Sequence, residues 1–312
     1  MEQTDDIFIG AITNYGVDKL MLLVSSLNQC GFRGEKYMVV YDVTYNTIEY
    51  LKRNGFKVWP VGKDDPEHCR YTYKPDAHAN FHINVERFLH MWQLLKGLPD
   101  TSKYRYVIST DIGDVVFQSD PSEWLERHLG DAQLNAASES ICFEDEVNWG
   151  AQNMRDSFGD DVFDHMKSRL IFNAGTLSGR FAAVRDLFLS IYLMCQSYHT
   201  ANPDQAAYNV LLSLQPYQDT TRFTPSFDAW ACQMGTTCDP RKDASIGASI
   251  VEPRPTMDVE SGLVTTQDGR PYVIVHQYNR LSGLTAILIN KYIMKSPSAL
   301  RELTGWLLHC VT

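Results

Sequence analysis

Two aspartates follow a strongly apolar segment near the middle of the first half of the chain. Residues 104–110 are rich in β-branched and aromatic side chains and predict a buried strand, with Asp111 and Asp114 at its carboxyl end. A second apolar run, 115–117, follows directly. Unpaired buried charges are costly, so carboxylates at such a place are usually paired or bound to a cation. Mg²⁺ and Mn²⁺ prefer carboxylate oxygens and often link them to phosphates. The pattern therefore indicates a metal-dependent site for a phosphorylated, nucleotide-linked substrate.

Strands and helices alternate through the first half of the chain. Short apolar runs predict strands, and apolar residues three and four apart predict helices. We expect strands at 7–13, 36–41, 57–61 and 104–110, and helices at 17–29, 45–53 and 83–98. Strands joined by such helices indicate a parallel sheet with right-handed crossovers. Because parallel strands end at one edge, this arrangement places Thr13, Asp42, Asp111 and Asp114 around one crevice.

The second half is less regular. We expect strands at 135–138, 169–177 and 272–276, and helices at 181–198, 204–214 and 300–308. The segments 62–79, 142–162 and 215–270 are rich in polar residues, proline or glycine and predict loops, the second with short helical pieces. No internal repeat or linker interrupts the chain, so we expect one continuous α/β domain.

Composition limits the classes of function. Of the 312 residues, 44% are hydrophobic and 21% are charged, which suits a folded globular chain. The formal net charge of −10 argues against nucleic-acid binding, which usually needs a basic face. The seven cysteines form no Cys-x-x-Cys pair, as is typical of reduced thiols. We see no basic, apolar leader and no apolar run of membrane-spanning length, so we expect a soluble, cytoplasmic protein, with a trimmed membrane-associated protein as the alternative.

Six short segments, taken in order, carry the most specific functional signal. They are Ile9-Gly-Ala-Ile-Thr13, Arg87-Phe88, Ser109-Thr-Asp-Ile-Gly-Asp-Val-Val-Phe-Gln118, Phe172-Asn-Ala-Gly175 with Ser178-Gly179, Asp204-Gln-Ala-Ala-Tyr-Asn209, and Val275-His-Gln-Tyr278. Their order and spacing resemble those of a glycosyltransferase of the GT-A fold. The resemblance implies a Rossmann-like mixed sheet flanked by helices. It further implies a nucleotide- and metal-binding half at 1–121, a donor-sugar and acceptor half at 122–285, and a helical extension at 286–312.

The resemblance also implies a metal site. It assigns Mn²⁺ or Mg²⁺ to Asp111, Asp114 and His276, where the ion would hold the diphosphate of a nucleotide-sugar donor. GT-A enzymes usually carry Asp-x-Asp, whereas this chain has Asp-x-x-Asp, so which aspartate contacts the metal directly stays open. Asp114 could instead cap a turn or pair with an arginine. His276 could be a structural residue at the end of a strand.

Other donor-binding roles rest on position. Thr13, Asn14 and Tyr15 end the first strand, where GT-A enzymes seat the base and ribose, and Asp42 ends the second strand. Arg87 lies on the polar side of its helix and could reach a phosphate bidentately, or could be solvated.

Two residues of the second half have a family role and a structural alternative. The resemblance assigns Asn173 to the donor sugar's hydroxyls, although an asparagine there could satisfy its own loop backbone. It places Asp204 beside the reacting sugar as base, sugar ligand or oxocarbenium stabiliser. Because Asp204 follows Asn202-Pro203 and begins a helix, it also fits an N-cap.

An acceptor site has weaker signals. Aromatic faces stack on sugar rings, and a nearby carboxylate can deprotonate an acceptor hydroxyl. Candidates for these roles are Glu139, Glu144, Asp145, Glu146 and the segment Phe227-Asp228-Ala-Trp230, with Asp228 as the candidate base. Solvated surface is the alternative for each.

The resemblance implies a metal-dependent transferase that moves a sugar from a nucleoside-diphosphate donor, UDP-linked, to a hydroxyl of a glycan, lipid or protein. Two alternatives stay open. A sugar-nucleotide pyrophosphorylase normally has a glycine-rich basic loop after the first strand, whereas Asn14-Tyr-Gly-Val-Asp18 has one glycine and an acid. A non-catalytic carbohydrate-binding protein on a transferase scaffold is the other. The sugar, the linkage, the stereochemical outcome and the oligomeric state are not determined by the sequence.

Overall fold

A computed structural model describes residues 5–74, 83–197, 202–281 and 283–295. Its strands are β1 Asp5–Ile12, β2 Glu35–Val40, β3 Val43–Thr44, β4 Phe56–Pro60, β5 Lys63–Asp65, β6 Arg70–Thr72, β7 Tyr104–Thr110, β8 Val115–Phe117, β9 Leu134–Cys142, β10 Leu170–Phe172, β11 Thr176–Arg180, β12 Thr221–Thr224, β13 Ala231–Gln233, β14 Thr256–Asp258, β15 Leu263–Thr265 and β16 Ile274–His276. Its α-helices are α1 Val17–Gln29, α2 Tyr45–Arg53, α3 Ile83–Lys96, α4 Pro121–His128, α5 Gly150–Phe158, α6 Asp160–Met166, α7 Phe181–Met194, α8 Asp204–Leu212, α9 Tyr217–Thr220, α10 Met234–Thr237, α11 Pro240–Ile246 and α12 Leu284–Ile289.

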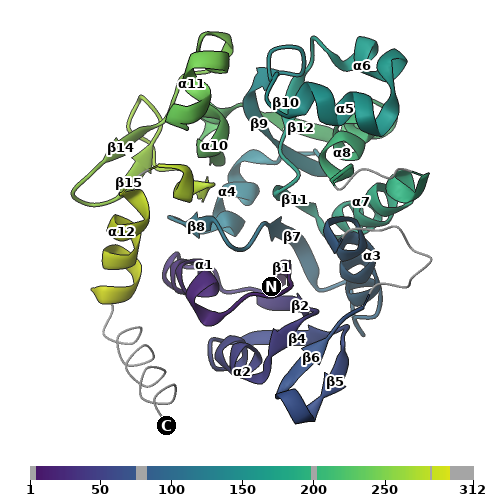
Figure 1. Cartoon of the computed structure of the whole chain (residues 1–312), viewed down its shortest axis with the longest axis vertical. Coiled ribbons are helices and arrows are strands. Elements are labelled where there is room, and N and C mark those ends of the chain that lie inside the picture. Colours follow the sequence, from purple (N-terminus) through teal and green to yellow (C-terminus); the bar gives the residue numbers. More distant parts are fainter. Residues whose placement is uncertain (1–4, 75–82, 198–201, 282, 296–312) are drawn as a thin grey trace.

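A mixed sheet of eight strands forms the centre of the molecule (Figure 1). Its order is β10-β9-β11-β7-β1-β2-β4, and β12 pairs with β9. The strands β4, β2, β1 and β7 are parallel, as the alternation of strands and helices predicts. β11 pairs antiparallel with β7, so one sheet runs from the first half of the chain into the second. The mixed α/β architecture expected from the sequence is confirmed.

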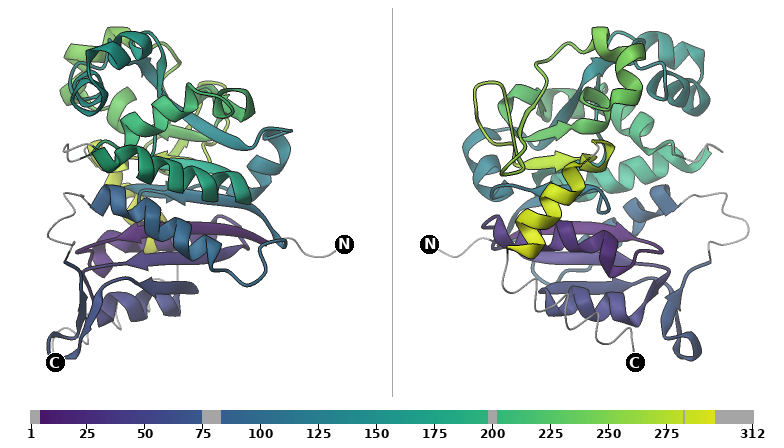
Figure 2. Two further views of the ribbon diagram at one scale, coloured as in Figure 1. Left: turned by 90° about the vertical axis from the view of Figure 1, so that its right-hand side faces the viewer. Right: turned by 60° about the vertical axis from the view of Figure 1, so that its left-hand side comes forward.

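Helices cover both faces of the sheet (Figure 2). Alternate residues of β1 point to opposite sides: Ile7 and Ile9 pack with α3 and α7, whereas Phe8 packs with α1, α2 and α4. This alternation follows from the two-residue period of a strand. Two hydrophobic cores therefore hold the sheet rigidly, and the strand ends carry the polar residues. None of the helices within the described residues has the length and apolar character needed to cross a bilayer.

A second, three-stranded sheet of order β13-β16-β8 connects distant parts of the chain. β8 runs antiparallel to β16, and Val115 is the register partner of His276. Asp114 immediately precedes β8 and His276 ends β16, so this pairing sets the two predicted metal ligands side by side. The small sheet therefore positions residues that the sequence separates widely.

Several local predictions differ from the structure. The predicted loop at 62–79 contains the hairpin β5–β6, whose strands are polar and partly exposed and so lack a hydrophobic alternation. The single strand predicted at 169–177 is interrupted at 173–175, and β11 continues to Arg180. The predicted loop at 215–270 contains short elements from α9 to β15. The helix predicted at 300–308 lies outside the described residues.

Candidate active site

A cavity of about 1050 Å³ lies where β1, β7 and β16 end. Its wall includes Thr13, Tyr15, Arg87, Asp111, Asp114, Asn173, Asp204 and His276 from the sequence prediction. These residues come from segments spread over most of the chain. The structure therefore brings together most of the predicted site at the carboxyl edge of the parallel strands.

Asp111, Asp114 and His276 converge in this cavity. One potential ligand atom from each lies within 4.8 Å of the others. Nε2 of His276 is 3.5 Å from Oδ2 of Asp111 and 3.6 Å from Oδ1 of Asp114. A Cβ on Gly175 would lie 2.5 Å from Oδ2 of Asp111, so only glycine leaves this carboxylate in place. Carboxylate oxygens with one imidazole nitrogen form a ligand set suited to a divalent cation.

The imidazole of His276 is held in one orientation. Its Nδ1 donates to Oε1 of Gln233 at 2.7 Å, and both side chains are buried. Nε2 is buried and has no hydrogen-bond partner among the described residues. The distances to the two carboxylates exceed those of normal hydrogen bonds, so Nε2 faces them without a hydrogen bond. A buried nitrogen without a partner, facing two carboxylates, fits a metal ligand better than a structural histidine.

Electrostatics in this cluster follow from burial and neighbouring charge. Burial tends to raise the pKa of Asp111, but Arg87 and His276 outweigh it and hold that pKa well below its usual range. Burial raises the pKa of Asp114, partly offset by His276. Burial tends to lower the pKa of His276, and the two aspartates reverse this and raise it. The cluster thus attracts positive charge, and its surroundings favour the ionised form of Asp111 more than that of Asp114.

Arg87 joins the metal cluster to α8. Its Nη1 lies 2.7 Å from Oδ1 of Asp111, and its Nη2 lies 3.0 Å from Oδ2 of Asp204. Its side chain is only 18% exposed, which differs from the solvated alternative. Pro203 occupies the N-cap position of α8 without a side-chain capping bond, and Asp204 instead bonds to Arg87. The carboxylate of Asp204 therefore faces the cavity.

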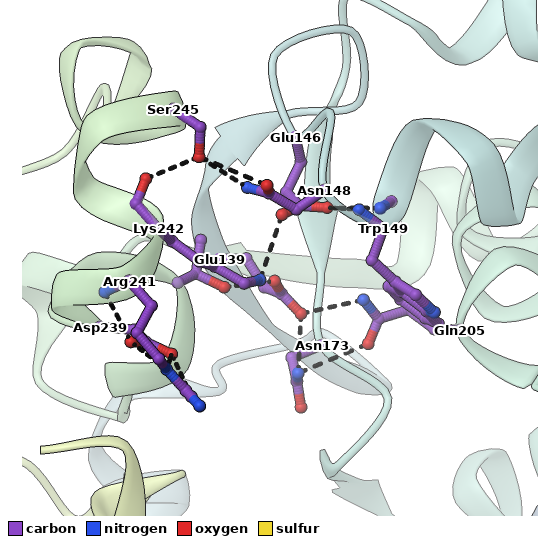
Figure 3. A network of polar contacts seen from close by, with 12 residues as sticks. Glu139, Glu146, Asn148, Trp149, Asn173, Gln205, Asp239, Arg241, Lys242 and Ser245 are labelled. Carbon is purple, nitrogen blue, oxygen red and sulfur yellow. Dashed lines mark hydrogen bonds and ion pairs between the residues drawn. The ribbon is translucent and has the colours of Figure 1, made fainter.

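Asn173 belongs to a buried polar network (Figure 3). Its amide nitrogen donates to Oε1 of Glu139 at 2.8 Å, and its oxygen accepts from the backbone of Gly175. Glu139 also accepts hydrogen bonds from Gln205 at 2.9 Å and from Thr236 at 2.8 Å. Asn173 thus accepts a hydrogen bond from the backbone of its own loop, which is the structural role considered as the alternative. Its side chain also lines the cavity. The amides of Asn173 and Gln205 are held in place by one buried carboxylate.

Three residues of the predicted donor-binding and catalytic sets are not brought to the cavity, and neither are the acceptor candidates Glu144, Asp145, Phe227 and Trp230. Asn14 has a positive φ of 54°, its N–H donates to the carbonyl of Asp42, and it does not line the cavity wall. Asp42 pairs with Arg70 at 3.1 Å, outside the wall. Asp228 pairs with Arg222 at 2.7 Å and is likewise outside it, so the position expected of an acceptor base is not observed. In the last two cases an arginine close in space takes up the carboxylate.

Sequence reasoning missed several residues of the wall. Lys19 and Arg280 line it and take part in no ion pair among the described residues. Lys19 lies over the Tyr15 ring, 5.0 Å from its centroid. Arg280 follows His276 by four positions, a spacing that could have drawn attention to it. Nothing in the sequence singles out Gln233, because its role depends on a contact with His276 in a distant segment, and Trp149, which lines the wall, belongs to no motif.

Known proteins resemble this chain in structure only. No protein-family model matches it, and no curated protein matches it at a significant level. The glycosyltransferase GlyE of Streptococcus pneumoniae TIGR4 is similar with a TM-score of 0.54 at 15% identity, over 97% of this chain and 64% of that one. The chain thus spans just under two thirds of GlyE's length. An active-site mutant of LgtC is similar with a TM-score of 0.50 at 13% identity, over 90% of this chain and 93% of that one. At these identities the likeness shows the fold, which is of the GT-A type.

Proposed function

We propose that this protein is a metal-dependent glycosyltransferase that uses a nucleoside-diphosphate sugar. The observation that carries the proposal is the convergence of Asp111, Asp114 and the unpartnered Nε2 of His276 in a large cavity at the strand ends. The GT-A fold, shared with structures of glycosyltransferases, supports it. We take UDP as the nucleotide and a hydroxyl of a glycan, lipid or protein as the acceptor.

The proposed metal site would hold Mn²⁺ or Mg²⁺ on Asp111, Asp114 and His276. When bound, such an ion stabilises the charge that develops on a departing diphosphate. Lys19 and Arg280 lie on the same wall and have no ion-pair partner in the described part of the chain, which suits phosphate oxygens. Thr13 and Tyr15 lie at the end of β1, where they would contact the nucleoside.

The remaining residues would orient the donor sugar. Asn173 and Gln205 present amides fixed by Glu139, and such groups can bind hydroxyls without losing freedom on binding. Arg87 holds Asp111 and Asp204 together, so the metal ligand and the carboxylate proposed to face the sugar keep a fixed separation. Asp204 would serve the reacting sugar from the start of α8. We place these roles in a donor-binding half at 1–121 and a sugar- and acceptor-binding half at 122–285.

The cellular setting is also a proposal. Cysteines 30, 69, 142, 195, 232 and 238 are free thiols, which supports a reducing, cytoplasmic compartment.

Donor hydrolysis tests the proposed function. The protein is incubated with a panel of UDP- and GDP-sugars in MnCl₂, in MgCl₂ or in EDTA, and the released nucleotide is measured by chromatography. We expect slow hydrolysis of at least one donor that EDTA abolishes. Metal-dependent binding without turnover on any donor, with or without sugar acceptors, would indicate the non-catalytic alternative. Absence of any nucleotide-sugar binding would refute the proposal.

A further inference from the structure

Trp149 is an aromatic side chain placed in solvent on the wall of the cavity. It is 40% exposed, and it alone among the described tryptophans lines this wall. A tryptophan contributes most to stability when its large ring is buried. Its partial exposure inside a cavity therefore indicates a surface kept free for a ligand.

The backbone that carries Trp149 is held rigidly. Oε2 of Glu146 accepts hydrogen bonds from the N–H of Trp149 at 2.9 Å and from the N–H of Gly150, which fixes the first turn of α5. Glu146 is almost fully buried, and its Oε1 lies 3.1 Å from Nζ of Lys242 on α11. A Cβ on Gly150 would lie 2.9 Å from Cδ1 of Ile171 and 3.2 Å from Oε2 of Glu146, so glycine relieves crowding at this turn. The indole is thus presented from a preorganised support, which lowers the entropy cost of binding.

A second bridge ties the same two elements together. The side chain of Asn148 bonds to Oγ of Ser245, with contacts of 3.0 and 3.3 Å. Figure 3 shows α11 on one side of the network and Trp149 with Gln205 on the other, with Glu139 and Asn173 between them. The cavity therefore has a polar floor beside one aromatic face.

The two cations on this part of the wall, Arg241 and Lys242, are both paired. Lys242 pairs with Glu146, and Arg241 pairs bidentately with Asp239 at 2.9 and 2.7 Å. Both cations are already matched by carboxylates, so an anionic ligand would gain little there. Side-chain amides, carboxylates and a guanidinium offer many donors and acceptors for hydroxyl groups. An aromatic face surrounded by such groups matches the apolar C–H face and polar rim of a neutral pyranose.

We propose that Trp149 is the stacking platform of an acceptor subsite for a neutral pyranose, which selects a carbohydrate over a lipid or peptide as the acceptor. The assignment of this subsite to the acceptor rests on the proposed function. The binding itself is testable without turnover. The platform lies in the part of the chain that follows β9 and includes α5 and α11.

Saturation-transfer NMR with methyl glycosides tests the inference. Methyl β-D-glucopyranoside, methyl β-D-galactopyranoside and methyl α-D-mannopyranoside are added to the protein with and without UDP and diamagnetic Mg²⁺. We expect transfer to the ring protons of at least one glycoside, reduced about fivefold in Trp149→Ala and retained in Trp149→Phe. Val147→Ala is the matched control, because Val147 is exposed two residues away and does not line the cavity. Circular dichroism confirms that each variant is folded.

The outcomes separate this inference from the proposed function. UDP binding to the wild-type protein is measured in the same samples by calorimetry, and its absence would count against the proposed function alone. Glycoside signals that are absent, or equal in wild type and Trp149→Ala, would overturn the platform. Octyl β-D-glucopyranoside is added in a separate sample. Saturation transfer to its alkyl chain but not to its sugar ring would also overturn the platform and would indicate a lipid acceptor. If Trp149→Ala reduced saturation transfer to UDP-glucose more than transfer to the methyl glycosides, the indole would contact the donor sugar, and the acceptor assignment would be overturned.

Discussion

Oε1 of Gln233 accepts a hydrogen bond from Nδ1 of His276 across 2.7 Å, between two strands of the small sheet. An amide oxygen can only accept, so in the neutral imidazole the bond places the proton on Nδ1 and leaves Nε2 as the nitrogen that can bind a metal. Outer hydrogen bonds of this kind orient histidine ligands and select their tautomer. Gln233 is therefore as much a part of the proposed metal site as the three residues that would touch the ion.

Replacing Gln233 by leucine should weaken metal binding. Without the acceptor, the imidazole of His276 loses its preferred tautomer and orientation, and Mn²⁺ affinity should fall about 10- to 100-fold by calorimetry. Thr237→Val is the control, because the hydroxyl of Thr237 bonds to the backbone carbonyl of Gln233 and does not contact His276. An equal loss in both variants would mean that packing, not orientation, sets the affinity.

Asp111→Asn should remove metal-dependent donor binding. The surroundings of Asp111 favour its ionised form, and we expect UDP affinity in the presence of Mn²⁺ to fall by about two orders of magnitude, with little change in EDTA. Asp42→Asn makes a matched control, since Asp42 also pairs with an arginine but lies outside the cavity wall. Near-normal Mn²⁺-dependent binding in Asp111→Asn would contradict the metal assignment.

Asp204→Asn should separate chemistry from donor binding. Asparagine has nearly the same size as aspartate, and no side-chain capping bond is lost at the start of α8, so the helix should persist. The lost charge should lower donor turnover by about 100-fold while UDP binding remains. Turnover and thermal melting are measured on the same preparations. Unchanged turnover with a lowered melting temperature would assign Asp204 a structural role through Arg87 alone.

Acid should destabilise the fold partly through Glu35. Burial tends to raise its pKa, but hydrogen bonds from Tyr37 and Tyr104 and from Lys57 and Lys103 outweigh this and lower it to about 2. A carboxyl with a depressed folded pKa stabilises above its unfolded pKa of 4.5, and this contribution is lost as the pH falls from there toward 2.

Glu35→Gln should therefore lower the free energy of unfolding by roughly 1 kcal/mol at pH 7, allowing for screening by solvent. The difference from wild type should shrink between pH 4.5 and 2 in urea titrations. Glu49→Gln is the control, because its ion pair with Lys52 is well exposed and should contribute little. A difference that grows on acidification would show that the sign is wrong.

The sequence predicted helices and strands correctly where apolar residues either repeat regularly or form a short continuous run. The bounds predicted for α1, α2 and β7 match the structure, because α1 and α2 have apolar residues at the helix period and β7 is a short run rich in β-branched and aromatic residues. The hairpin β5–β6 was missed because its residues are polar and are held by pairing with each other and with β3. The break at 173–175 was missed because it depends on Asn173 bonding to Glu139, a contact between separate strands.

Some residues of the candidate site could also be predicted from the local sequence, and others could not. Asp111 and Asp114 were identified because a buried strand delivers them to the sheet edge, and that is a local property of the sequence. Asp228 was placed by analogy with its aromatic neighbours, whereas its nearby Arg222 removes it from the cavity. Gln233 carries no local signal, since it is recognised only by its contact with His276, and the position of Trp149 on the cavity wall depends on how distant segments meet there.

The register of β8 on β16 has a consequence for how the protein unfolds. An ion shared by Asp114 and His276 would fasten the last described strand to a segment of the first half of the chain. Any binding that requires the native state adds to its stability, so a chelator should speed amide exchange in β16 before it affects β1 or β2. Binding of the ion and attachment of β16 to the rest of the fold would then occur together. Detachment of β16 would abolish metal binding even with Asp111 and Asp114 intact.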